Sequence, residues 1–90
     1  MVQYEIKVSG RVQGVGYRYF VQKQAQIFQL KGWVRNVADG GVLVMVQGDK
    51  VVIDTFVDYL RIGPTMSRVT NIVSTPVKFN EEFPDFRIRY

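Results

Sequence analysis

The sequence predicts an α+β domain in which two helices cover one face of a mostly antiparallel sheet. Segments whose apolar residues alternate with the period of a strand are interleaved with two segments whose apolar residues recur with the period of a helix. The chain has 90 residues, of which 47% are hydrophobic and 13% aromatic, a composition that excludes intrinsic disorder. We therefore expect a single domain that spans residues 1–90.

The first elements are a strand and a helix. Apolar residues at positions 2, 4, 6 and 8 alternate with Gln3, Glu5 and Lys7, which predicts a strand with one buried face. From Tyr17 to Phe28, apolar residues recur at helical spacing, so this segment should pack one face on the core. Gly32 is expected to break the helical pattern.

A hairpin and a second helix follow. Residues 33–37 and 42–46 have strand-like composition, and Asp39-Gly40-Gly41 between them is typical of a hairpin turn. Asp49 is a suitable N-cap for the second helix, and Gly63-Pro64 should end it. The expected buried stripe of that helix comprises Val52, Ile53, Phe56, Val57 and Leu60, while Asp54, Asp58 and Arg61 should lie on its wet face.

Two closing strands complete the prediction, at residues 69–73 and 86–90. The element order is then strand, helix, strand, strand, helix, strand, with one extra strand at the C-terminus. That order is typical of the ferredoxin-like β-α-β-β-α-β sandwich. Because many activities occur on this fold, the function must come from particular residues.

Composition limits the chemistry that the chain can use. There is no cysteine and no histidine, which excludes disulfides, thiolate nucleophiles, zinc–thiolate sites and an imidazole general base. The formal charge of +4 is scattered, so it favours small anions over nucleic acid. No secretory leader or membrane-length apolar segment is apparent, so we expect a cytoplasmic protein with no membrane association.

The segment Gly10–Arg18 carries the strongest functional signal. Three glycines between a strand and a helix permit a tight turn whose successive N–H groups point at one spot. The helix that follows adds its unpaired first-turn amides and the positive end of its dipole. Arg18 supplies a planar set of donors in the same turn. These features predict a cradle for an oxyanion such as phosphate.

Two motifs resemble the signatures of the acylphosphatases, small enzymes that hydrolyse the carboxyl–phosphate anhydride of acyl phosphates. The first is Val8-Ser9-Gly10-Arg11-Val12-Gln13-Gly14-Val15-Gly16-Tyr17-Arg18. The second is Gly32-Trp33-Val34-Arg35-Asn36, followed by Gly40, Val42 and Gly48. Length and element order are also similar to those of the family, so the resemblance covers the whole chain.

The resemblance implies a site and a mechanism. Arg18 would hold the substrate phosphate, and Asn36 would orient the attacking water. The rest of the phosphate cradle would be the main-chain amides of Gln13, Gly14, Val15, Gly16, Tyr17 and Arg18. No metal, cofactor or covalent intermediate would be needed, since a carboxylate leaves readily and the water proton passes to a phosphate oxygen. Inorganic phosphate would be product and inhibitor, and a monomer is expected.

Three further expectations concern single residues. Tyr17 stands where the family usually has Phe or Met, and its hydroxyl is expected near the cradle. Leu43 stands where an acidic residue is common, and it should lie on the sheet surface. Related chains suggest that the C-terminal carboxylate of Tyr90 approaches Arg18.

Two alternatives stay open at this point. An RNA-binding module on the same fold is suggested faintly by Lys31-Gly32-Trp33, although Val34 and Arg35 do not continue that signature. Such a module would bind RNA in a salt-sensitive way. A regulatory anion-binding domain would bind phosphate through the same loop but release no product.

Overall fold

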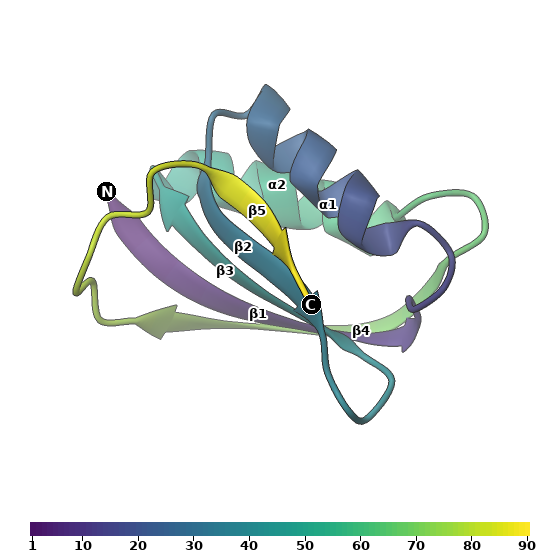
Figure 1. Ribbon diagram of the computed structural model, residues 1–90. Helices are drawn as coiled ribbons and strands as arrows, with labels where there is room; N and C mark the ends of the chain where they lie inside the picture. Colours follow the sequence, from purple (N-terminus) through teal and green to yellow (C-terminus); the bar gives the residue numbers. More distant parts are fainter.

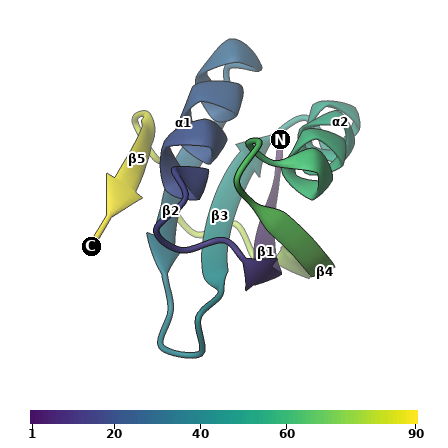
Figure 2. The ribbon, with the colours of Figure 1, turned by 90° about the vertical axis from the view of Figure 1, so that its right-hand side faces the viewer.

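The computed structural model describes residues 1–90 and contains the two helices and five strands that the sequence predicts. In chain order they are β1 (Val2–Arg11), α1 (Tyr17–Ile27), β2 (Lys31–Asn36), β3 (Val42–Gly48), α2 (Lys50–Ile62), β4 (Arg68–Val77) and β5 (Phe86–Arg89). Figure 1 shows both helices on one face of the sheet, and Figure 2 shows that the other face is left uncovered by helices. The predicted ferredoxin-like sandwich is confirmed.

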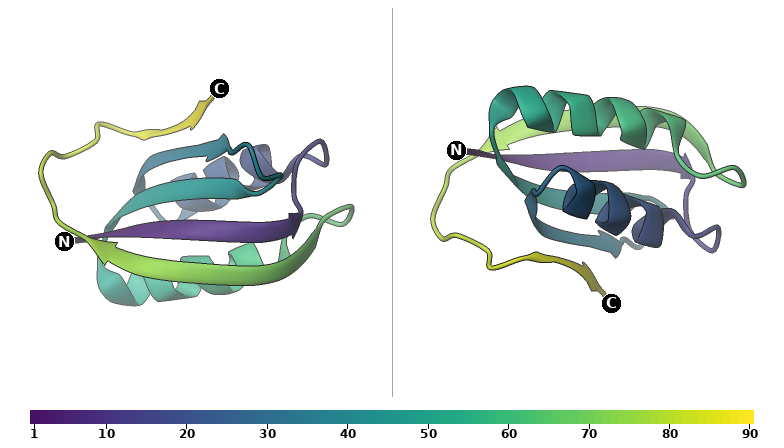
Figure 3. Two further views of the ribbon diagram at one scale, coloured as in Figure 1. Left: turned by 90° about the horizontal axis from the view of Figure 1, so that it is seen from below. Right: turned by 90° about the horizontal axis from the view of Figure 1, so that it is seen from above.

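The sheet is mostly antiparallel, with strand order β4-β1-β3-β2-β5. β3 pairs antiparallel with both β1 and β2, so β1 and β2 point the same way. The C-terminal β5 joins the edge of β2 as the only parallel pair. The carboxyl ends of β1, β2 and β5 therefore lie along one edge of the sheet (Figure 3).

The core lies between the sheet and the two helices. α1 buries Tyr17, Val21 and Ala25, and α2 buries Ile53, Phe56, Val57 and Leu60, as the periodicities predict. The polar positions predicted for the wet face of α2 are exposed. Burial of this apolar surface is the main stabilising term of the fold. Neither helix is long and apolar enough to cross a bilayer.

The end of α1 differs from the prediction. The helix stops at Ile27, and Gln29 takes the left-handed conformation, at φ 57°, that a glycine usually supplies after a helix. Gly32 instead lies inside β2, where a Cβ would collide with the carbonyl oxygen of Met45 on β3. A glycine is required at position 32 because β2 and β3 approach closely there. The expectation that Gly32 breaks the helix was therefore wrong.

Gly10 also belongs to the sheet rather than to the turn. It is the last residue but one of β1, at φ 124°, and the pairing register between β1 and β4 shifts between Ser9 and Gly10. A Cβ at Gly10 would collide with the carbonyl oxygen of Arg68. The predicted turn of three glycines therefore contains only Gly14 and Gly16, and Gly10 forms a bulge that precedes it.

Candidate active site

The predicted site residues gather at the edge of the sheet where β1, β2 and β5 end. The loop of residues 12–16 follows β1 and leads into α1. Asn36 is the last residue of β2, and Tyr90 follows β5, one position beyond the Arg35–Arg89 pair. We call this edge, with loop 12–16 and the first turn of α1, the site edge. Chain segments far apart in sequence thus contribute to one place.

The main-chain N–H groups of loop 12–16 are free. Gly14 and Gly16 adopt left-handed conformations, at φ 74° and 80°, and no hydrogen bond within the chain uses the N–H groups of residues 13–16. The first bond of α1 runs from the Phe20 N–H to the Gly16 carbonyl at 3.1 Å, and no side chain caps the helix. These unused donors, together with the helix dipole, make an anion-binding turn.

Arg18 extends from the first turn of α1 toward the C-terminus. One of its Nη atoms donates to the carbonyl oxygen of Arg89 at 3.3 Å, and its guanidinium lies 4.7 Å from the centre of the Tyr90 ring. The four ion pairs of the structure do not include Arg18. The ring of Tyr90, rather than its carboxylate, makes the contact with Arg18, which differs from the expectation. Most of the guanidinium donors therefore remain available.

A cavity of about 180 Å³ opens beside Arg18. Gly14, Gly16 and Arg18 are among the residues that line it. The remaining lining residues are Val12, Tyr17, Tyr19, Ile88 and Tyr90. A small anion can therefore reach both the loop and the guanidinium. No group of three or more His, Cys, Asp or Glu side chains is arranged to hold a metal ion.

Asn36 lies at the same edge but does not line the cavity. It pairs with Val42 across β2 and β3, and its side chain shares the helix-covered face with Val34. Its Oδ1 is buried and has no hydrogen-bond partner in the chain. A buried acceptor left unsatisfied lowers the stability of the fold by about 1–3 kcal/mol. We therefore expect a donor from outside the chain to bind this oxygen.

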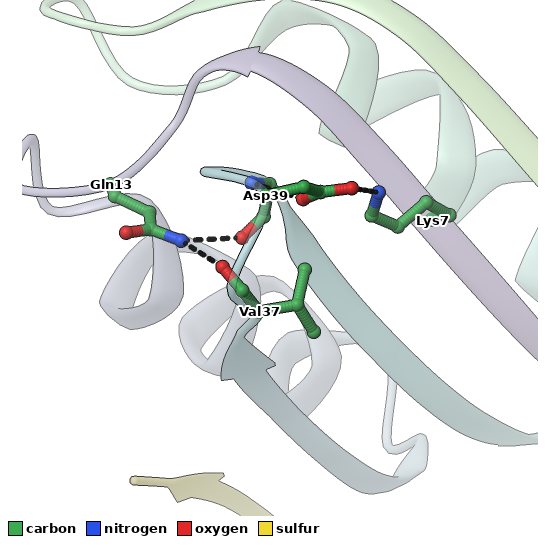
Figure 4. Close-up of polar contacts among 5 residues, drawn as sticks. Lys7, Gln13, Val37 and Asp39 are labelled. Carbon is green, nitrogen blue, oxygen red and sulfur yellow. Dashed lines mark hydrogen bonds and ion pairs between the residues drawn. The ribbon is translucent and has the colours of Figure 1, made fainter.

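The side chain of Gln13 has a role that the sequence interpretation missed. Its Nε2 donates to the carbonyl oxygens of Val37 and Gly41, each at 2.8 Å, as Figure 4 shows. These bonds fasten loop 12–16 to the hairpin turn that directly follows Asn36. The only signal was the glutamine that the first signature requires, and only its main-chain N–H was expected to matter.

The same hairpin turn is held from its other side by an ion pair. Lys7 Nζ lies 2.6 Å from Asp39 Oδ2, and Asp39 Oδ1 accepts the Gly41 N–H at 2.9 Å (Figure 4). The hydrogen bond from Lys7 and that from Gly41 lower the pKa of the Asp39 carboxyl. Lys7 therefore helps to fix the geometry of the hairpin turn next to the site.

Two single-residue expectations can be judged from the structure. Tyr17 is 1% exposed, and its hydroxyl donates to the Leu60 carbonyl oxygen at 2.8 Å. The hydroxyl therefore lies in the core between the helices, where burial raises its pKa, and the expectation that it adjoins the cradle was wrong. Leu43 lies on the helix-free face of the sheet, opposite Lys7 and Arg35, as expected.

Trp33 does not offer a surface on which an RNA base could stack. It is only 9% exposed, and the guanidinium groups of Arg35 and Arg89 lie 5.5 and 4.9 Å from its ring centre. RNA-recognition sheets use exposed aromatic rings for stacking. The sheet face of this chain lacks that feature at the position where the sequence suggested it.

Known proteins are similar to this chain in both fold and sequence. A model of the acylphosphatase family matches residues 4–88. An acylphosphatase of Bacillus subtilis is 43% identical over 90 residues, which are 100% of this chain and 99% of that protein. The crystal structure of acylphosphatase from Bacillus subtilis matches with a TM-score of 0.96 over 100% of both chains. An acylphosphatase structure from Coxiella burnetii gives 0.91 at 35% identity, over 98% of this chain and 92% of that one. The chain therefore belongs to the acylphosphatase family of hydrolases, which act on acyl phosphates.

Proposed function

We propose that Arg18 and the main-chain N–H groups of residues 13–18 bind the phosphoryl group of an acyl phosphate, while Asn36 orients the attacking water. One observation carries the proposal: the N–H groups of residues 13–16 have no acceptor in the chain, and they adjoin a guanidinium without a carboxylate partner. Such an arrangement stabilises oxygens that gain negative charge, because its dipoles are already oriented before substrate arrives.

The role of Asn36 follows from its chemistry and its surroundings. An amide cannot take up a proton at neutral pH, so Asn36 orients the water rather than deprotonating it. Its buried Oδ1 has no donor in the chain, and a water would supply one. That hydrogen bond would leave a lone pair of the water directed at phosphorus.

The proposed reaction is a single displacement. The water oxygen forms a bond to phosphorus while the bond between phosphorus and the acyl oxygen breaks, and the carboxylate leaves with the electron pair. A proton of the water passes to a phosphate oxygen of the substrate. The chain supplies position and charge stabilisation, which dominate the catalysis of phosphoryl transfer, and no cofactor or covalent intermediate takes part.

The proposal includes the wider properties expected from the sequence. Residues 1–90 act as one acylphosphatase domain and as a monomer in the cytoplasm, without nucleic acid or membrane partners. Inorganic phosphate is both product and competitive inhibitor, because it offers the same oxygens to the loop as the substrate does.

Hydrolysis of benzoyl phosphate in the presence of a chelator tests the proposal. We expect rapid turnover by the wild type, and a loss of about 10²–10³-fold in both Arg18→Ala and Asn36→Ala. Arg18→Ala should also weaken competitive inhibition by inorganic phosphate, whereas Asn36→Ala should preserve it. Arg61→Ala and Asn71→Ala remove exposed side chains of the same types that do not line the cavity, and they should retain full activity.

Two outcomes contradict the proposal in different ways. A folded wild type that binds phosphate but releases no product would be an anion-binding regulatory module. Unchanged substrate saturation in Arg18→Ala would show that the phosphoryl group binds elsewhere.

A further inference from the structure

The residues that line the cavity beside Arg18 are of two chemical kinds. The loop glycines and the guanidinium are those that the proposed function assigns to the phosphoryl group. The others are apolar or aromatic, and they include Ile88, Tyr19 and Tyr90. Arg18 is the only lining residue with a charged side chain.

The two tyrosine rings are unusually accessible. Tyr19 is 64% exposed and Tyr90 is 97% exposed, and Tyr19 makes no ring–ring contact. Tyr59, an exposed tyrosine on α2, instead packs its ring 5.5 Å from that of Phe28. The Tyr19 ring therefore presents surface that no other ring of the chain covers, and the Tyr90 ring remains largely exposed beside its contact with Arg18.

If the loop and Arg18 hold the phosphoryl group, the acyl substituent extends past the remaining lining residues, which are apolar or aromatic. Aromatic and apolar surface binds planar or hydrophobic groups, and each ring contact favours such a group by about two- to tenfold. A second negative charge on the acyl group would meet no second cation in the lining. It would also lose water without gaining a partner.

We propose that Tyr19, Tyr90 and Ile88 form an acyl-group subsite that selects acyl phosphates with an uncharged, planar or apolar acyl group. This proposal rests on the function proposed above, and it adds the substrate class of the same site. Arg18 and the loop bind what all acyl phosphates share, and the subsite discriminates between them through the acyl group.

The test is the ratio of kcat/KM for benzoyl phosphate to that for acetyl phosphate. We expect Tyr19→Ala to lower this ratio about two- to tenfold, and Tyr19→Phe to preserve it because the ring remains. Tyr59→Ala is the matched control and should leave the ratio unchanged. Succinyl phosphate, which adds a carboxylate, should be turned over by the wild type less efficiently than benzoyl phosphate.

Tyr90→Ala gives a second variant at the same subsite. It should lower activity toward both substrates, because Tyr90 also touches Arg18, and lower the ratio as well. A ratio that stays constant in both Tyr19→Ala and Tyr90→Ala, with hydrolysis retained, would overturn the subsite while leaving the proposed function intact.

A non-hydrolysable pair separates the two proposals if the wild type shows no turnover. Benzoylphosphonate and acetylphosphonate carry a carbon–phosphorus bond in place of the labile one. A preference for the benzoyl compound that falls in Tyr19→Ala would support the subsite without the reaction, and equal affinities in both proteins would overturn it.

Discussion

At the edge where β3 ends and α2 begins, polar groups have partners within the chain, whereas at the site edge the N–H groups of residues 13–16 and Asn36 Oδ1 do not. α2 is capped by Asp49, whose Oδ1 accepts the Val51 N–H at 3.2 Å, and α1 starts at Gly16 without any side-chain cap. We call the first of these the capped edge. Each helix has main-chain N–H groups in its first turn that lack an acceptor within the helix. A side chain of the chain caps these groups only in α2.

Two amide side chains show the same contrast. At the capped edge, Gln47 Nε2 donates to Gln3 Oε1 at 2.7 Å, and Gln47 Oε1 accepts the Phe83 N–H at 2.9 Å. At the site edge, Asn36 Oδ1 is buried without a partner. Because unsatisfied polar groups cost stability, their concentration at one edge supports our proposal that a ligand binds there.

The largest expected effect separates activity from stability at Asn36. Asn36→Ala should lower kcat about 10²–10³-fold, since it removes the group that we propose orients the water. Its free energy of unfolding should not fall, because the deleted Oδ1 has no partner in the chain to lose. Kinetics and denaturant unfolding of the same preparation check both parts. A large loss of stability would mean that Asn36 belongs to the framework instead.

Gln47→Leu should give the opposite pattern. The change leaves the Phe83 N–H and the Gln3 side chain without their partner, so we expect a destabilisation of about 1–3 kcal/mol. Activity in the folded variant should be unchanged, because Gln47 lies at the capped edge. Urea unfolding and steady-state kinetics provide the measurement. A fall in kcat as large as that of Asn36→Ala would contradict the claim that the capped edge affects stability and the site edge affects activity.

The two hydrogen bonds of the Gln13 side chain hold loop 12–16 beside the hairpin turn that follows Asn36. They therefore connect the free N–H groups of the loop to the residue that follows Asn36. Gln13→Met keeps the length of the side chain but removes both donors to the hairpin, so loop 12–16 and Asn36 lose their fixed spacing. We expect kcat to fall by up to about 10²-fold, which is the scale of a small misplacement, with a stability loss of about 1 kcal/mol. Gln26→Met, an exposed change on α1, is the control. Equal kcat values in the two variants would show that these bonds do not position the site.

The smallest effect concerns the Lys7–Asp39 ion pair. The folded state lowers the pKa of Asp39 from its ordinary value of 3.8, so the pair contributes stability above that pH. The contribution is lost as pH falls through the folded pKa. Wild type should therefore be slightly more stable than Asp39→Asn at pH 7, and the difference should disappear in strong acid. Thermal unfolding across this range checks the sign, and a difference that grows in acid would contradict it.

Periodicity and spacing predicted most of the fold, because buried stripes, caps and turns are local properties of the sequence. The stripe of α2 and its Asp49 cap are examples. The boundaries that depend on tertiary contact were not predictable in this way. Gln29 ends α1 in a conformation that sequence assigns to glycine, and Gly32 is required by a carbonyl on the neighbouring strand.

The site shows the same division. Arg18 and Asn36 were identified from motif spacing, and the structure brings them to one edge. The direction in which a side chain points was not visible in the sequence, because helix phase and cross-strand register decide it. The Tyr17 hydroxyl turns into the core, and the Gln13 amide turns to the hairpin.

The most direct test of the central claim is a titration of the ¹⁵N-labelled protein with inorganic phosphate, followed by the chemical shifts of the main-chain amides. We expect the largest shifts on residues 13–18, whose N–H groups would gain an acceptor. The amides at the start of α2, which Asp49 caps, should move little. Shifts centred on residues 49–51, or shifts spread evenly over the chain, would contradict the assignment of loop 12–16 as the phosphate cradle.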